Sequence, residues 1–215
     1  MYCKRCGTCC RKGGPGLHRE DQNLLSEGHL SFDHLVTIRQ GEIVLNPLTG
    51  MPEPAAQELV KINGRGGDWS CMFFGEGDSS CTIYRNRPLE CRLLKCWDPA
   101  DIEAVIGKDN LRRLDLLSPG DPARQMIESH EKLCPGHEIT ELCIQYQEEP
   151  GRHDLLNSLT SFVRHDLHFR MEVFDQLKLS SASELFFLGR PVFKVLAPFG
   201  LVLREDHRGI SLSRI

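Results

Sequence analysis

The apolar positions divide the chain into two unlike halves. Residues 152–178 carry apolar side chains at helical spacing, and shorter amphipathic stretches predict further helices over 99–117, 122–133 and 138–148. Residues 191–204 have the pattern of a β-hairpin that turns at Pro198-Phe199-Gly200. We therefore expect a mainly helical second half with a hairpin near its end.

The first half has shorter apolar runs that glycines and prolines interrupt. Short helices are expected over 20–30 and 32–40, strands and turns over 42–63, and a hairpin that joins 71–74 to 81–84. These patterns predict an α+β fold. Residues 1–98 would form a small irregular cysteine-rich metal-bound region with short strands, and residues 99–215 a helical region packed with the first as one unit.

Composition and charge narrow the classes of function. Hydrophobic residues make up 40% of the 215 positions and charged residues 26%, which is ordinary for a soluble globular protein. The formal charge of −4 argues against a general nucleic-acid or membrane-surface binder. No apolar stretch approaches the roughly 18 residues that span a bilayer, and the start of the chain lacks an apolar signal region. We expect a cytoplasmic protein.

The cysteines give the most direct indication of the chemistry of this protein. The chain has ten, and eight of them form two groups of four. These are Cys3, Cys6, Cys9 and Cys10 in a C-x2-C-x2-C-C run, and Cys71, Cys81, Cys91 and Cys96 between Trp69 and Trp97. In a reducing cytosol this spacing is more typical of a metal site than of the alternative, a disulfide framework. Thiolates suit zinc and iron–sulfur clusters because both are soft or borderline acceptors.

The first group resembles the start of a bacterial ferredoxin run, with one departure. Its fourth cysteine is adjacent to the third, and side chains of neighbouring residues diverge in helices and strands alike. Cys9 and Cys10 are therefore expected to serve different metal atoms, unless one of them is spare. Each centre would then draw ligands from both groups, which would hold the N-terminal loop against residues 71–96.

Basic residues flank both groups in a chain that is acidic overall. They are Lys4, Arg5, Arg11 and Lys12 beside the first group and Arg85, Arg87, Arg92 and Lys95 beside the second. We expect these cations to lower thiol pKa values and to balance the charge of a thiolate centre. The alternative is a solvated basic surface. Trp69 and Trp97 are expected to shield the site from solvent.

The motifs resemble those of a known family. Cys3-Lys-Arg-Cys6-Gly-Thr-Cys9-Cys10, together with Trp69-Ser-Cys71, Cys81-Thr-Ile-Tyr84 and Arg87-Pro88-Leu-Glu-Cys91-Arg92, is similar to the CxxCxxCC (YkgJ-like) family of zinc- or iron-chelating domains, over roughly residues 1–97. The resemblance implies that the eight cysteines bind the metal. Flagellin lysine N-methylase, regarded as an iron–sulfur protein, looks like a distant relative. Its activity does not transfer, because no glycine-rich cofactor loop follows a strand here.

Two cysteines lie outside the expected region of resemblance. Cys143 falls in a predicted helix between Leu142 and Ile144 and is expected to be a buried small side chain. Cys134 precedes Pro135-Gly136 and is a possible additional ligand.

Three functions compete. The first is a redox or iron-handling protein with an iron–sulfur centre, of which a 4Fe–4S cluster is the favoured form. The second is a structural zinc protein that binds a protein partner, and the third is a metal-dependent peptide- or protein-modifying enzyme. In each case we expect a metal ion or cluster as partner and no nucleic acid or membrane. The ferredoxin-like spacing favours the cluster.

Overall fold

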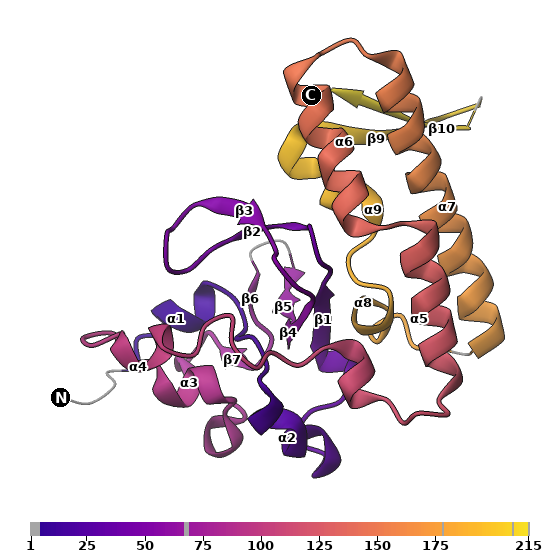
Figure 1. Cartoon of the computed structure of the whole chain (residues 1–215). Coiled ribbons are helices and arrows are strands. Elements are labelled where there is room, and N and C mark those ends of the chain that lie inside the picture. Colours follow the sequence, from indigo (N-terminus) through magenta and orange to yellow (C-terminus); the bar gives the residue numbers. More distant parts are fainter. Residues whose placement is uncertain (1–4, 67–68, 178, 208, 215) are drawn as a thin grey trace.

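The computed structural model describes residues 5–66, 69–177, 179–207 and 209–214. It joins an irregular part with short antiparallel strands to a group of longer helices and a C-terminal hairpin, which confirms the α+β class (Figure 1).

The helical turns and strands of the first part are short. They are α1 (Thr8–Arg11), η1 (Arg19–Asp21), α2 (Gln22–Ser26), η2 (Phe32–His34), β1 (Leu35–Ile38), β2 (Ile43–Leu45), β3 (Pro52–Pro54), β4 (Leu59–Ile62), β5 (Gly64–Arg65), β6 (Ser70–Cys71), β7 (Phe74–Gly75), β8 (Ser80–Cys81), η4 (Tyr84–Asn86), α3 (Leu89–Leu93) and α4 (Ala100–Glu103).

The second part contains the longer helices and the hairpin. Its elements are η5 (Arg113–Leu116), α5 (Pro122–Leu133), α6 (Gly136–Glu148), α7 (His153–Leu177), α8 (Glu184–Phe187), α9 (Val192–Val195), η6 (Ala197–Phe199), β9 (Leu201–Asp206) and β10 (Gly209–Arg214).

A two-stranded sheet replaces the helix expected over 32–40. Only the single turn η2 is helical, and β1 then pairs antiparallel with β4, with Val36 opposite Lys61 and Ile38 opposite Leu59. All four residues of β1 are buried. Its β-branched side chains pack well on a pleated surface, and the pairing with a distant strand outweighs the local helical pattern.

The hairpin predicted over 71–84 forms with a different register. β7 pairs with β8, so that Phe74 lies opposite Cys81, whereas Cys71 pairs with Gly64 in the separate β5–β6 ladder. The two cysteines therefore lie on neighbouring ladders, each held by backbone hydrogen bonds.

The helix expected over 99–117 is wrong beyond its first turn. α4 ends at Glu103, and Gly107 and Asp109 have positive φ angles of 75° and 49° that no helix continues through. Leu111 then exchanges backbone hydrogen bonds with distant residues, since its amide donates to the carbonyl of Leu17 and its carbonyl accepts from Val60. These long-range bonds hold the segment in an extended form.

The longest periodic patterns give the observed helices. The predictions for 122–133, 138–148 and 152–178 correspond to α5, α6 and α7 within two residues at each end. The side chain of Asp121 caps α5 by accepting a hydrogen bond from the Ala123 amide at 2.9 Å, and Pro122 occupies the first turn. Among the described helices, α7 included, none is long and apolar enough to cross a membrane.

The C-terminal hairpin lies further along the chain than expected. Residues 192–199 form α9 and η6, and Gly200, with a φ of 72°, ends that turn. The hairpin pairs β9 with β10, with Leu203 opposite Leu212. Pro198 and Phe199 thus belong to a helical turn, because the left-handed glycine follows them as a helix stop rather than lying at the tip of a hairpin.

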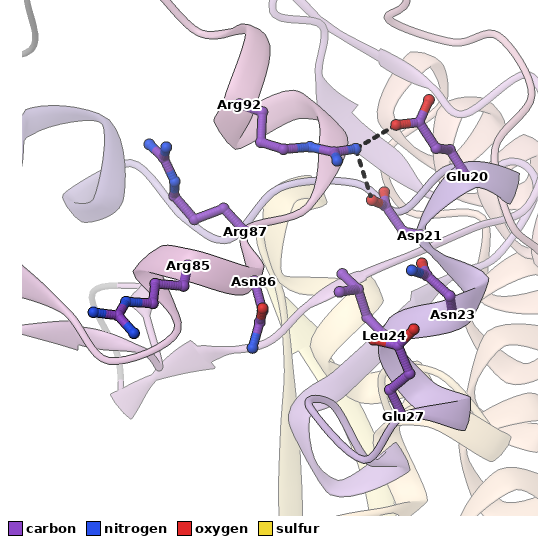
Figure 2. A pocket seen from close by; sticks show the side chains of 9 residues that line it. All are labelled: Glu20, Asp21, Asn23, Leu24, Glu27, Arg85, Asn86, Arg87 and Arg92. Atoms are coloured by element: carbon purple, nitrogen blue, oxygen red, sulfur yellow. Dashed lines mark hydrogen bonds and ion pairs between the residues drawn. The ribbon is translucent and has the colours of Figure 1, made fainter.

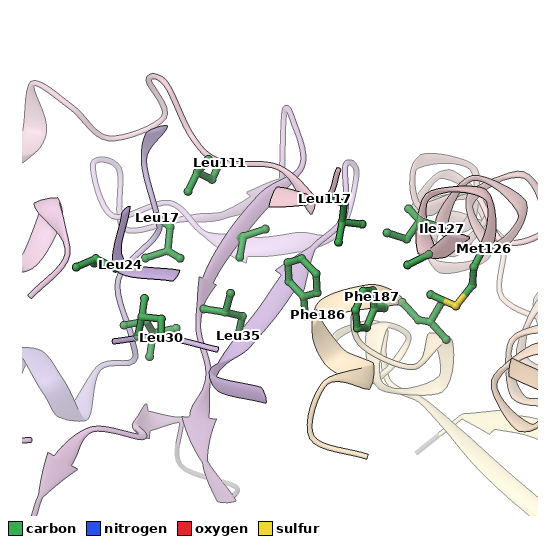
Figure 3. Packing of buried hydrophobic residues seen from close by; sticks show 14 of the residues in the cluster. Leu17, Leu24, Leu30, Leu35, Leu111, Leu117, Met126, Ile127, Phe186 and Phe187 are labelled. Carbon is green, nitrogen blue, oxygen red and sulfur yellow. The ribbon is translucent and has the colours of Figure 1, made fainter. Parts of the chain in front are cut away.

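The larger of two apolar clusters joins the two parts of the chain. In Figure 3, Leu17 and Leu35 from the first part lie on one side of Phe186 and Phe187, and Ile127 of α5 lies on the other. Phe186 stacks on Phe32 with ring centroids 4.3 Å apart. A second cluster buries α6, α7 and α9 against β9 and β10. Residues near the end of the chain therefore complete the core of its beginning.

Candidate metal centre

The cysteines that the structure describes lie on short elements of the first part. Cys9 and Cys10 are on α1, Cys71 on β6, Cys81 on β8 and Cys91 on α3. Cys6 precedes α1 and Cys96 follows α3, and both are exposed. Cys3 lies outside the described residues. The described thiols of both groups thus lie in the same part of the structure, and which of them bind metal stays a prediction.

A close contact between Gly7 and Phe74 places α1 against the segment that carries the second cysteine group. Gly7 precedes α1 with a φ of 73°, and a Cβ on it would stand 2.3 Å from Cζ of Phe74. Arg11 contributes to the same junction, because its guanidinium lies over the Phe74 ring and donates to the carbonyl of Cys6 at 2.9 Å. α1 also packs beside β6, the strand of Cys71.

Glu90 fixes the glycine-rich loop next to Cys91. One carboxylate oxygen accepts from the Gly16 amide at 2.9 Å, and the other lies 3.3 Å from Nε2 of His18. Nδ1 of the same ring faces the carbonyl of Lys108 at 2.8 Å. Because an acceptor faces each nitrogen, the protonated ring can donate from both, and the hydrogen bond to Glu90 raises the pKa of His18 against the effect of burial.

A polar cavity of about 240 Å3 lies beside α3. Figure 2 shows the side chains that line it. Arg92 points toward Glu20, 2.5 Å away, and Asp21 at 3.9 Å. Oδ1 of Asp21 also accepts from the Leu89 amide at 2.8 Å. These contacts attach α3, and with it Cys91, to η1.

Five thiols lie within electrostatic reach of one another. Burial is the main cause that raises the pKa of Cys10 to about 12, and the neighbouring thiols Cys9, Cys71 and Cys81 contribute to that rise. Burial is likewise the main cause that raises the pKa of Cys91, and the other four thiols add to it. Clustered, desolvated thiols resist deprotonation by themselves, so a bound cation is what brings them into the thiolate form.

Cys6 differs from that cluster. It is exposed, and a hydrogen bond with the Thr8 hydroxyl, at 3.3 Å, lowers its pKa. None of the other described thiols contributes to that shift. The structure therefore brings together five of the eight predicted ligands and leaves Cys6 and Cys96 at the rim.

The flanking cations meet the expectation only in part. Besides the Thr8 hydrogen bonds, the charge of Arg11 contributes to the lowered pKa of Cys6, whereas other flanking cations have partners of their own. Arg92 is paired with Glu20, and Lys95 forms an ion pair with Asp101. Arg5 and Arg87 lie over the Tyr84 ring, 4.8 and 3.9 Å from its centroid. Lys4 lies outside the described residues.

The indole rings do not enclose the site. Trp69 and Trp97 are each 42% exposed, so they do not form the shield that we expected.

A cation that the sequence did not single out lies inside the site instead. Lys61 of β4 has the charges of Cys71 and Glu90 nearby, and burial lowers the pKa of its ammonium group. The only signal in the sequence is a lysine in the apolar strand Leu59–Ile62, which by itself indicates an outward-facing position.

The donor set is chemically uniform. Thiolates without imidazole or carboxylate ligands suit zinc or an iron–sulfur cluster. Among the described cysteines no three sulfurs all lie within 4.8 Å of one another, whereas a tetrahedral zinc shell with bonds of about 2.3 Å brings its sulfurs to about 3.8 Å. The described sulfurs are therefore not arranged as the closed shell of one zinc ion.

A family comparison agrees with this chemistry. The sequence model of CxxCxxCC, described as a "putative zinc- or iron-chelating domain", matches residues 2–135. The chain belongs to the CxxCxxCC family. The match is longer than the residues 1–97 that we expected, and it includes Cys134. No curated protein and no solved structure matches the chain.

The CxxCxxCC match ends beside a second group of potential ligands. His130, Cys134 and Asp166 are fully buried with their ligand atoms within 4.8 Å of one another. However, Oδ1 of Asp166 already accepts from Nε2 of His130 at 2.7 Å and from Arg170 at 2.9 Å, and Oδ2 accepts from the Val192 amide. A carboxylate that is occupied by these donors and lies beside an arginine is a structural hydrogen-bond acceptor rather than a metal ligand.

The two cysteines outside the thiol cluster are both buried. Cys143 is fully buried in the second apolar cluster, and burial raises its pKa to about 12. Cys134 has a raised pKa for the same main reason, and its sulfur lies 3.7 Å from the carbonyl of Phe162.

Proposed function

We propose that this CxxCxxCC protein holds an iron–sulfur centre, with a 4Fe–4S cluster as the favoured form, and serves in electron transfer or iron handling. The ligands would come from Cys3, Cys6, Cys9, Cys10, Cys71, Cys81, Cys91 and Cys96. The observation that carries the proposal is the convergence of five thiols from two distant segments. The ferredoxin-like C-x2-C-x2-C start and the absence, among the described cysteines, of three sulfurs within 4.8 Å of one another support a cluster over zinc.

A structural zinc site is the competing proposal, because zinc also takes thiolates and the family description includes it. In that case the bound ion would join α1 to the second group, and the helical part would be the surface for a protein partner.

One preparation separates these proposals. The protein is purified without oxygen, reconstituted with iron and sulfide, and characterised by its visible spectrum and metal content. We expect a brown protein that absorbs near 400 nm, roughly the charge-transfer region of thiolate clusters. A colourless protein with stoichiometric zinc and no uptake of iron would overturn the cluster proposal.

A matched pair of variants tests the ligands. Cys91→Ser removes a thiol of the cluster, and we expect the bound metal to be lost and the first part to become less stable, since metal affinity is also folding energy. Cys143→Ser removes a thiol of the second apolar cluster. It should keep the wild-type metal content, and a loss of metal in Cys143→Ser would contradict the proposed set of ligands.

A further inference from the structure

Lys61 projects from β4 toward the thiol segments. Its backbone is bridged to Gly16, and its Nζ lies 3.6 Å from the point where a Cβ on Gly13 would stand. The same point is 3.7 Å from the carbonyl oxygen of Trp69, two residues before Cys71. The ammonium group therefore lies beside the loop that follows Cys10, and the segment that leads into the strand of Cys71 lies beside the same loop residue.

The ammonium group of Lys61 lacks a hydrogen-bond or ion-pair partner among the described residues. The other internal cations, by contrast, are well paired. Arg39 and Arg190 both contact Glu42, at 3.1 and 2.7 Å. Glu90 is the carboxylate whose charge acts on Lys61, but it already accepts a hydrogen bond from the Gly16 amide and lies against His18.

A partly buried charge without a partner costs free energy, so Lys61 would be stabilised by an anion other than Glu90, whose carboxylate is already engaged. The thiols provide one when they bind metal. A zinc ion with four thiolates carries a net charge of −2, as does an oxidised 4Fe–4S cluster with four thiolates.

We propose that Lys61 is the internal counter-charge of the metal–thiolate centre, a positioning residue that stabilises the thiolates and favours the reduced form of an iron–sulfur centre. This inference rests on the proposed function. The cation acts over a short path of low polarity, where a charge interaction is stronger than at the surface. A nearby positive charge stabilises the more negative reduced state and so raises the reduction potential.

The test compares Lys61→Met, which keeps the aliphatic length, with Lys61→Arg, which keeps the charge, and with Lys12→Met, which removes an exposed cation near α1. Zinc affinity is measured by competition with a chromophoric chelator. The reduction potential is measured on protein reconstituted with iron and sulfide, and stability by urea unfolding of the metal-free and metal-loaded forms.

We expect Lys61→Met to bind zinc about tenfold more weakly and to shift the reduction equilibrium about tenfold toward the oxidised form, or about 59 mV for one electron. Lys61→Arg should recover most of both losses, and Lys12→Met should change neither because exposed charge is screened. Metal-free Lys61→Met should be at least as stable as the metal-free wild type, whereas its metal-loaded form should be less stable than the loaded wild type.

Several outcomes overturn the inference. One is wild-type zinc affinity and potential in Lys61→Met, and another is an equal loss of stability with and without metal, which would mark the lysine as merely structural. A wild-type protein that binds zinc but takes up no cluster contradicts the cluster proposal alone, and the zinc titration still decides the role of Lys61. A wild type that binds neither overturns both.

Discussion

At the scale of single residues, the charged groups inside this protein lie mainly where its two parts meet. Arg113 donates to the carbonyl of Phe187 at 2.7 Å and to the carboxylates of Glu58 and Glu131. Its side chain is fully buried, so the loss of one partner would leave a buried charge uncompensated. Such groups hold distant segments in one arrangement, and their protonation couples folding to pH.

His130 gives a testable case of this coupling. Burial lowers the pKa of His130 more than the hydrogen bond to Asp166 raises it, and the neutral ring donates from Nε2 while Nδ1 has no partner. Below about pH 6.5 the imidazole of His130 binds a proton in the unfolded chain but stays neutral in the folded protein until a lower pH. We therefore predict that the free energy of unfolding of the metal-free, reduced protein falls as the pH drops below about 6.5.

The variant His130→Gln keeps a donor toward Asp166 and should lose this part of the pH dependence, as measured by urea unfolding at a series of pH values. The control is His168→Gln, whose side chain is 73% exposed. His18 has the opposite effect on the free energy of unfolding, because its pKa is raised in the folded protein. Its stabilising contribution is complete below about pH 6.5 and is lost as the pH rises through the folded pKa. An unchanged slope in His130→Gln would refute the assignment.

At the scale of elements, the short helix α1 depends on one glycine. Gly7 combines a φ of 73° with the space that the ring of Phe74 occupies, and α1 carries Cys9 and Cys10. A side chain at this position strains the backbone and pushes the helix away from β7. The packing of one aromatic ring thus sets where two of the thiols lie.

We predict that Gly7→Ala weakens zinc binding by about tenfold, because a left-handed backbone costs about 1–2 kcal/mol for a residue with a Cβ and the contact with Phe74 adds to it. The matched control is Gly28→Ala, which has a φ of 76° but no atom within 4 Å of the added Cβ. Chelator competition measures both. Equal losses of zinc affinity in the two variants would show that the strain alone, and not the position of α1, is responsible.

At the scale of the whole molecule, buried contacts join the regions that the sequence divides at residue 98. Thr37 of β1 donates to the carbonyl of Phe186 at 2.6 Å, and the larger apolar cluster contains residues from both parts. Packing of this kind predicts one cooperative unit, although the short strands of the first part are weak by themselves.

We predict that tryptophan fluorescence, which reports only on Trp69 and Trp97 in the first part, and far-UV circular dichroism, dominated by α5 to α7, follow the same urea transition. Phe186→Ala should lower the free energy of unfolding by about 3–5 kcal/mol in both signals. Met171→Ala, at a side chain that is 70% exposed, should leave both unchanged. Two separate transitions would instead indicate that the parts fold independently.

The sequence by itself determined the features that depend on local periodicity and residue chemistry. The apolar spacing predicted α5, α6 and α7 because long helices are stabilised by one continuous buried face. The two cysteine groups predicted thiolate chemistry, since ligand type follows from residue identity alone. Local geometry also predicted that the adjacent Cys9 and Cys10 serve different metal atoms. That stays a prediction, and the structure places the two side chains close enough to interact with each other.

Only the tertiary structure decided the features that depend on distant pairing. Residues 35–38 are a strand because β4 offers hydrogen bonds and a buried surface, and residues 107–111 are extended because Leu111 bonds to Leu17 and Val60. The same holds for the metal site. The packing of the chain brings five thiols together, places Lys61 near Cys71 and pairs Arg92 with Glu20. Residue identity does not give these placements, because burial and distance decide whether a charge acts on its neighbours.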